Sequence, residues 1–402
     1  MSALLGLGTY VPVWEHSGQR VVGPDEDAVT MAVAAGRALI DGLREDAQSG
    51  REPDVRRVVL VSRDLPLLEG GSGAALLAGL GVPAGLPVVE QVGGGPSVLE
   101  LIATAEPGTL VLAADLEAAG AGAALVGSQG TALDHVGRVT GSLPTTSRGR
   151  DGVRWDYDDP RLMLERGTKA ALADLDLADK PDVIAGLGPK PTRQLSRKDV
   201  ATLPTTGASS AIFALAEAGS GDVVVATEQA SAVAVSVAGV APTFRDEAAP
   251  LPVPRTRTTP GPDIGISLPA YDRAFDSKLR WEAGSCNACG NLAVPPRLRC
   301  THCGSEEGWS LAPLPRSGEV YTKVDIHVPV PGRATPYSLA IVQLDNTEVR
   351  TLVTVTGAPS GALEIGDRGR LVLRRIDTRS GVPDYGHALR PDVVDDTRGD
   401  KA

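Results

Sequence analysis

The four cysteines of this chain, Cys286, Cys289, Cys300 and Cys303, form two CxxC pairs and are the only cysteines in 402 residues. The spacing C-x2-C-x10-C-x2-C lets each pair present two thiolates to one tetrahedral ion. Four thiolates leave no coordination position open, so the spacing predicts a structural zinc site rather than a catalytic one. Four buried free cysteines or a redox pair are the other interpretation. His302 lies between Cys300 and Cys303, where a filled ligand shell predicts an exposed side chain.

Length and charge restrict the class of protein. A chain of 402 residues is too long for one core and predicts two or three domains. The net charge is −11, and residues from Tyr271 onward carry 17 basic and 17 acidic side chains, so the negative excess lies in residues 1–270. An acidic body disfavours nucleic acid as a partner. No signal peptide or membrane span is visible, and with the CxxC pairs this predicts a cytoplasmic protein.

Residues 1–241 alternate strand and helix patterns. Short runs rich in Val, Ala and Gly, such as VRRVVLVS and GDVVVATEQ, are typical of buried strands, and amphipathic segments separate them. The clearest helix follows Pro24 and Asp25, which we expect to open it, and Arg44 marks its end. The pattern predicts a layered α/β domain, and two similar halves, roughly 1–140 and 141–240, are compatible with it.

The rest of the chain changes character. Seven prolines in residues 242–269 predict an extended, semi-rigid linker at 242–270 that lets the C-terminal module move. Residues 271–310 are expected to form a short helix and the zinc ribbon. Alternating strands over 311–390 predict a small β-barrel, and 391–402 a polar tail.

The C-terminal motif resembles a known family. The segment CNACG…VPPRLRCTHCGSEEGW, followed by SGEVYTKVDIHVPV…TPYSLAIVQLD…LEIGDRGRLVLRR, is similar to the DUF35 family over about 130 residues. The resemblance implies a rubredoxin-like zinc ribbon joined to an OB-fold barrel. Members of that family accompany thiolase-superfamily enzymes, bridging them to partners or helping to bind an acyl-CoA.

The N-terminal domain also carries a resemblance. The segments LLGLGTYVPVWE…VVGPDEDAVTMAVAAGRALI and LPTTGASSAIFALAEAGSGDVVVATEQASAVAVSV are similar to hydroxymethylglutaryl-CoA synthases of the thiolase superfamily. The resemblance extends weakly over residues 1–240, with shortened loops. It implies an αβαβα layered fold that dimerises through its central sheet.

The family's catalytic residues are changed in this chain. The family uses a cysteine nucleophile, a histidine near the acyl thioester and a glutamate acid/base. Gly93 stands near the position of the cysteine, and Gly186 or Leu187 at that of the histidine. Arg63 and Asp64 occupy the position of the family's glutamate. The family also has an asparagine in a later loop, and residues 204–206 stand in its place here. No cysteine precedes Cys286, and no histidine lies between His135 and His302, so misalignment does not account for these losses.

Other side chains are candidates with a structural alternative. Ser97, Ser209 and Ser210 are possible nucleophiles, but without a nearby histidine base a capping or turn role is favoured. His135 is either a displaced base or a loop residue, and we expect the latter. His16 is expected to be structural. The three glycines of VGGGPS are interpreted as a tight turn rather than an anion cradle, and no P-loop lysine follows them.

A basic cluster interrupts the acidic domain. Lys190, Arg193, Arg197 and Lys198 lie within nine residues. Lys190 and Arg193 are the candidate contacts for the phosphates of CoA or an acyl-CoA. A solvated helix start after Pro191 is the alternative interpretation.

Two functions follow as hypotheses. In the first, the chain is an accessory subunit of an acyl-CoA-processing complex. Its zinc is structural, and its partner is a cysteine-bearing thiolase-superfamily enzyme in a homo- or heterodimer. In the alternative, it is an active hydroxymethylglutaryl-CoA synthase-like condensing enzyme or acyltransferase with unusual catalytic residues.

Overall fold

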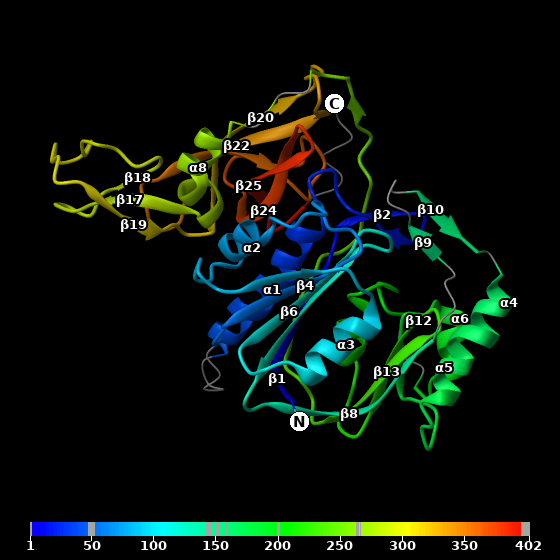
Figure 1. Ribbon diagram of the computed structural model, residues 1–402. Helices are drawn as coiled ribbons and strands as arrows, with labels where there is room; N and C mark the ends of the chain where they lie inside the picture. The colour runs from blue at the N-terminus through cyan, green and yellow to red at the C-terminus, as the bar shows by residue number, and fades with distance from the viewer. Residues whose placement is uncertain are drawn as a thin grey trace.

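A computed structural model describes residues 2–46, 53–141, 146–148, 153–157, 159–198, 202–262, 265 and 267–394. The N-terminal part, here called the body (residues 2–247), is built on a ten-stranded mixed sheet (Figure 1). A three-stranded zinc ribbon and a closed five-stranded barrel follow it. In the described part of the chain, no helix is long and apolar enough to cross a membrane.

The two halves of the body's sheet repeat one topology. The first half has the order β1 (Ser2–Val11), β7 (Gly120–Gly127), β6 (Thr109–Asp115), β4 (Arg57–Val61), β5 (Val88–Gln91). The second has the order β8 (Thr131–Thr140), β13 (Ser231–Ala238), β12 (Val223–Glu228), β11 (Val183–Ala185). Each half shows the same sequence of antiparallel and parallel pairings. Among the described residues, the second half has no strand that corresponds to β5.

Helices cover both halves and fill the space between them. On the outer face of the first half lie α1 (Ala28–Glu45) and α2 (Gly73–Leu80). Between the halves lie α3 (Gly95–Thr104), labelled in Figure 1, and α7 (Ser210–Ala216). Both helices contact strands of the two halves. On the other outer face, α4 (Pro160–Leu162) leads into the π-helix η2 (Met163–Thr168) and α5 (Lys169–Asp174), and α6 (Pro189–Leu195) follows β11. The expected αβαβα layering is confirmed.

The central helices explain the small side chains of the sequence. Because α7 has one half of the sheet on either side, its residues from Ser210 to Leu215 are all buried. A helix enclosed in this way is apolar all round rather than on one stripe. The Ala- and Val-rich composition lets the two halves of the sheet approach one helix layer closely.

Helix α1 begins later than its sequence pattern indicated. Pro24 and Asp25 precede it, and Asp27 is the N-cap. The Asp27 carboxylate accepts a hydrogen bond from the Thr30 N–H (2.9 Å), and the Thr30 hydroxyl accepts one from the Asp27 N–H (2.8 Å). This reciprocal cap satisfies two N–H groups that helix geometry leaves unpaired. Glu26 bends back to accept from the Gly23 N–H at 2.7 Å, which places its carboxylate outside the helix.

The proline-rich segment is extended, as its composition indicates. It is not free, however, because its short strands pair with strands of the body and of the C-terminal part. β14 (Thr243–Glu247) pairs in parallel with β1. β15 (Leu251–Pro252) pairs with β2 (Trp14–His16), which in turn pairs with β3 (Gln19–Arg20). β16 (Arg257–Thr258) pairs with β21 (Ala334–Thr335), a short strand in a connection of the barrel that is not one of its five strands. Residues 243–262, called the strap below, therefore run along the body and onto the barrel.

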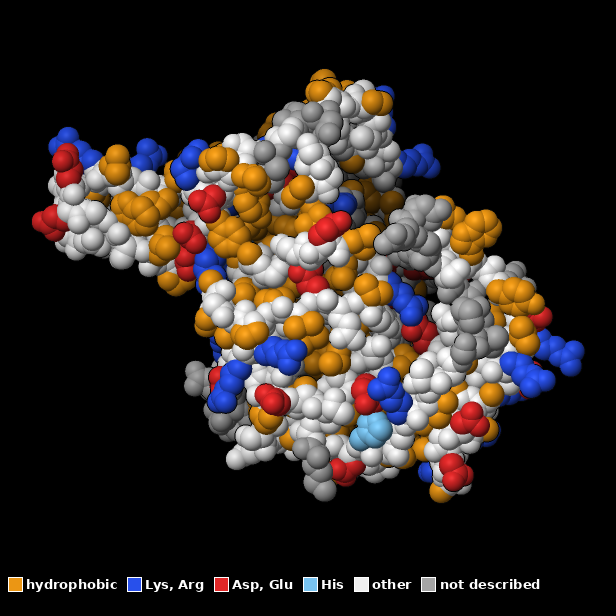
Figure 2. Space-filling model, viewed as in Figure 1, with side chains coloured by type: hydrophobic (Ala, Val, Ile, Leu, Met, Phe, Trp, Pro, Cys, Tyr) orange, Lys and Arg blue, Asp and Glu red, His pale blue; other side chains and the backbone are white. Residues whose placement is uncertain are grey.

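Beyond the strap lie the ribbon and the barrel. Helix α8 (Leu268–Phe275) and the π-helix η3 (Asp276–Arg280) lead into the ribbon strands β18 (Leu292–Ala293), β17 (Glu282–Cys286) and β19 (Trp309–Pro313). The barrel closes in the order β20 (Ser317–Ile326), β22 (Tyr337–Leu344), β23 (Arg350–Val355), β25 (Val382–Pro391), β24 (Arg368–Arg379). A further hairpin, β9 (Thr146–Arg148) and β10 (Arg154–Asp156), belongs to the body. Figure 2 shows the ribbon standing out from the rest of the molecule.

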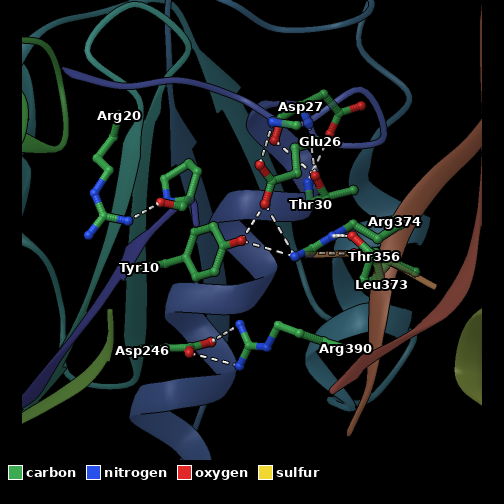
Figure 3. A network of polar contacts seen from close by, with 12 residues as sticks. Tyr10, Arg20, Glu26, Asp27, Thr30, Asp246, Thr356, Leu373, Arg374 and Arg390 are labelled. Carbon is green, nitrogen blue, oxygen red and sulfur yellow. Dashed lines mark hydrogen bonds and ion pairs between the residues drawn. The ribbon is translucent and has the colours of Figure 1, made fainter. Parts of the chain in front are cut away.

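A buried polar network joins the barrel to the body (Figure 3). Arg374 of β24 is 1% exposed and donates to the Tyr10 hydroxyl at 2.9 Å, while its guanidinium lies 3.2 Å from the Glu26 carboxylate. Tyr10 donates to the same carboxylate. Arg390 makes a two-pronged contact with Asp246 of β14 at 2.8 and 2.9 Å. These contacts hold the barrel against the body, which contrasts with the mobile module expected from the linker composition.

Candidate functional site

The two cysteine pairs sit in matching turns. Gly290 N–H donates to the Cys286 carbonyl at 2.8 Å, and Gly304 N–H donates to the Cys300 carbonyl at 3.0 Å. Both glycines have φ near +75°, at 73° and 75°, a conformation that side chains disfavour. Each turn thereby directs two thiols to the same side, as a zinc knuckle requires.

The four sulfur atoms fit a tetrahedral zinc ion. All four lie within 4.8 Å of one another, with Cys286 and Cys303 Sγ 3.8 Å apart and Cys289 and Cys300 Sγ 3.7 Å apart. Zn–S bonds of about 2.3 Å in a tetrahedron put the sulfurs about 3.8 Å from each other. His302 is exposed, as expected. The predicted structural zinc site is confirmed at all four cysteines.

In the body, several strand ends meet the N-terminus of α3, where the resemblance placed the catalytic groups. Gly94 caps α3, and a Cβ on Gly94 would overlap the carboxylate of Glu228, the last residue of β12. Arg63, just after β4, forms an ion pair with Glu228. This pair links the two halves of the sheet over the start of α3, where a carboxylate is favoured by the helix dipole. The space in front of Gly94 is thus filled by a side chain of the chain itself.

A second polar cluster lies beside it. Asp115, the last residue of β6, accepts hydrogen bonds from Ala208 N–H (2.7 Å), Ser209 N–H (2.8 Å) and the Ser209 hydroxyl (2.5 Å). Burial raises the pKa of Asp115, and the hydrogen bonds from Ser209 and Ala208 oppose that rise. Thr205 shares a 2.9 Å hydrogen bond with the Ser209 hydroxyl. This cluster fixes the loop before α7.

None of the candidate serines is set up as a nucleophile. Ser209 and Ser210 are fully buried, so their hydroxyls are out of reach of a thioester, and the Ser210 hydroxyl donates to the Gly207 carbonyl at 2.6 Å. Ser97 lies in the first turn of α3, and its Cβ is next to the position that a side chain on Gly93 would occupy. In the described part of the chain, none of these hydroxyls contacts a histidine. Ser209 has the structural role that the sequence favoured, because it ties the loop before α7 to Asp115, whereas Ser97 lies inside α3 and does not cap it.

The histidines of the body lie elsewhere. His135 is in strand β8, not in a loop as expected, and its Nε2 atom is 3.0 Å from the Glu100 carboxylate of α3. The loop interpretation was wrong because β8 continues through the polar residues that pair with β13. His16 ends the short strand β2.

The basic cluster divides into two pairs. Arg197 lies 3.4 Å from Asp182, and Lys198 forms an ion pair with Asp222. Lys190 and Arg193 are exposed on α6, and neither has an ion pair within the part of the chain that the structure describes. Of these four described side chains, Lys190 and Arg193 are the two without a carboxylate partner.

Comparison with known proteins identifies relatives of the C-terminal third of the chain. Residues 278–307 match the family model described as the ChsH2 rubredoxin-like zinc ribbon domain. The benzoylsuccinyl-CoA thiolase subunit BbsA of Thauera aromatica is 32% identical over 140 residues, which span 34% of this chain and 95% of BbsA. The chain belongs to the BbsA family. The rest of this BbsA-family chain lies outside that match.

Solved structures resemble both parts of this BbsA-family chain. The Ltp2-ChsH2(DUF35) aldolase is 27% identical, covers 33% of this chain and 100% of its own, and has a TM-score of 0.27. PksG, a HMG-CoA synthase from Bacillus subtilis, is 14% identical, covers 59% of this chain and 79% of its own, and has a TM-score of 0.45.

Glu228 was missed in the sequence. It is an acidic residue directly after the buried run VVVAT. A charged side chain at the end of a buried strand is the one local signal by which it could have been found. Its partner Arg63 lies 165 positions earlier by residue number, too far for any spacing rule to join them.

Replacing Gly94 with alanine tests how tightly Glu228 fills this space. We expect G94A to lower the free energy of unfolding by about 1–3 kcal/mol, because the new methyl group displaces the paired carboxylate. In an E228A background the same change is expected to cost much less. Urea unfolding of the four chains of this double-mutant cycle measures the coupling. Equal costs in both backgrounds would show that Glu228 does not occupy the space.

Proposed function

We propose that this chain is a non-catalytic subunit of an acyl-CoA-processing thiolase-superfamily complex. The observation that carries the proposal is the carboxylate of Glu228 in front of Gly94, in a chain whose only thiols lie in the ribbon. The relationship to BbsA, named as a thiolase subunit, supports it. A covalent acyl transfer needs an accessible nucleophile and a base within hydrogen-bond reach.

The proposed partner is an enzyme that supplies the missing cysteine. The body presents the same layered fold that the resemblance attributes to condensing enzymes, so it is suited to pair with such an enzyme. Lys190 and Arg193 are proposed to contact the phosphates of a CoA ester, since they are exposed cations without a carboxylate partner among the described residues. In this arrangement the chain holds or guides the ester, and the partner performs the chemistry.

The isolated chain is expected to form no covalent acyl-enzyme with acetyl-CoA. Cys286, Cys289, Cys300 and Cys303 hold zinc, and Ser209 is buried. Intact-protein mass spectrometry after incubation with acetyl-CoA is the measurement. A stable +acetyl adduct in the body that disappears in S97A or S209A would refute the proposal and favour the alternative of an active condensing enzyme.

A reconstitution experiment tests the partner. The tagged chain is purified from its native host, and the bound proteins are identified by mass spectrometry. We expect a thiolase-superfamily enzyme with a catalytic cysteine, and acyl transfer that depends on that cysteine and increases when this chain is added. An isolated chain that turns over acyl-CoA without any partner contradicts the assignment.

A further inference from the structure

We propose that the cavity at the mouth of the barrel binds a nucleoside phosphate. This cavity, called the mouth cavity below, measures about 680 Å³ and lies between the strap, the edge of the body and the barrel. Its size suits a nucleotide-sized ligand, since small-molecule sites commonly measure about 300–1,000 Å³. The inference does not depend on the proposed function, because it concerns residues outside the body's strand-end site.

The mouth cavity occupies the edge of the barrel at which OB-type barrels bind ligands. One wall is the loop between β20 and β22, where Val330 and Arg333 lie, and others are the end of β24 and the segment after β23. In OB folds the loop between the first two strands and the adjacent strand faces commonly form the binding surface. The strap closes the remaining side, because β16 pairs with β21 and the Gly332 N–H donates to the Thr259 carbonyl at 2.8 Å.

The strongest sign of a ligand is the stack of Arg333 on Tyr337. The guanidinium carbon lies 4.2 Å from the centre of the Tyr337 ring, and both residues line the cavity. Among the described residues, no carboxylate lies within ion-pair distance of Arg333. A stacked guanidinium keeps its N–H edge free for an in-plane anion, and its flat face suits a base.

The charge of the lining favours an anion. Three arginines, Arg333, Arg375 and Arg379, face two carboxylates, Asp25 and Asp377. Arg379 lies 3.2 Å from Asp377 and 3.6 Å from Asp384, so its charge is compensated, whereas Arg375 donates to the uncharged Pro24 carbonyl. The positive charge of the lining therefore comes from Arg333 and Arg375, which face the single carboxylate of Asp25. This local positive excess stands in a chain with a net charge of −11. A cationic pocket in an acidic protein concentrates anions against the overall field.

The remaining lining suits the neutral part of a nucleoside. Proline, valine and isoleucine side chains offer flat apolar contacts, and threonine and serine hydroxyls lie among them, as Pro254, Pro336, Ile376, Thr258 and Ser338 illustrate. A planar base needs apolar or aromatic contact, and a ribose needs hydroxyl partners. Phosphates complete the match by binding the arginine N–H groups.

A second arginine–tyrosine pair on the same barrel provides a matched control. Arg350 lies 3.6 Å from the centre of the Tyr321 ring and donates to Gln343 at 2.8 Å. Neither Arg350 nor Tyr321 lines the mouth cavity. R333A and R350A therefore remove the same kind of stacked cation, at the cavity and away from it.

Calorimetric titration with adenosine 5′-diphosphate tests the proposal. The titrations use the full chain carrying K190A and R193A, so that the CoA contact proposed above does not contribute. We expect saturable binding that R333A weakens at least about tenfold, that R333K weakens less and that R350A leaves unchanged. Thermal melts show whether the variants are folded. If R333A does not fold, R333K, which keeps the positive charge but loses the planar stack, provides the comparison with wild type.

Inorganic phosphate, adenosine and an eight-nucleotide thymidine oligomer are the comparison ligands. Weaker binding of phosphate and of adenosine than of the diphosphate supports a site for both parts of the nucleotide. No binding of the diphosphate, equal effects of R333A and R350A, binding of phosphate as tight as the diphosphate, or preferred binding of the oligomer would each overturn the proposal.

Discussion

Replacing Cys300 with serine is expected to release the zinc ion and unfold the ribbon. A structural zinc site contributes on the order of 10–16 kcal/mol of apparent binding free energy, and much of that is folding free energy. The ribbon has little else to hold it, because most of its residues between Cys286 and Gly308 are exposed or half-buried. Inductively coupled plasma mass spectrometry should find about one zinc ion per wild-type chain, and far less in C300S.

The control for this change is H302A. His302 lies in the same turn, but only its backbone N–H contacts a cysteine sulfur, at 3.4 Å from Cys300. H302A should keep the zinc and the melting curve of the wild type. Trp281 and Ala283 at the base of the ribbon pack into the barrel core, so C300S should also lower the melting temperature of the barrel. Zinc retained at full occupancy in C300S would contradict the four-cysteine site.

Replacing Arg374 with methionine is expected to lower the free energy of unfolding by about 3–5 kcal/mol. Arg374 and Glu26 are both almost fully buried, so the change leaves the buried Glu26 carboxylate without its cation. Burial opposes the charge of Arg374, but the attraction of Tyr10 and Glu26 outweighs it and raises the pKa of the guanidinium. Urea unfolding, read together with limited proteolysis of the strap, measures the loss and shows whether the barrel separates from the body.

Two further chains make this test specific. R370M removes an exposed arginine of the same strand, 3.8 Å from Asp392, and should change stability by less than about 1 kcal/mol. The double change E26Q/R374M removes both charges and should recover much of the lost stability. A single R374M chain as stable as R370M would mean that this network does not join the barrel to the body.

Local signals in the sequence were enough to predict the zinc site, the layered body and the barrel. The zinc site was predicted in full because its four ligands lie within 18 residues, and their spacing by itself determines the knuckle geometry. The layered body followed from alternating buried strands and helices, and the barrel from period-two strands with turn residues between them. These features depend on neighbours along the chain, which a single sequence displays directly.

Contacts between residues that are far apart in the sequence were revealed by the tertiary structure alone. Tyr10 and Arg374, which meet at the junction, are 364 positions apart, and Asp115 and Ser209 are 94 apart. The proline-rich segment looked like a free linker because a strand's composition does not reveal whether another strand lies beside it. Glu228 looked like an ordinary residue at a strand end.

The sequence by itself determined which residues this chain lacks and which metal it binds, because composition and short spacing are local properties. Tertiary structure decided what fills the space left at Gly94 and how the barrel is held on the body. Both depend on side chains that reach the same point from distant strands, and the contact energy between them exists only after the sheets have packed.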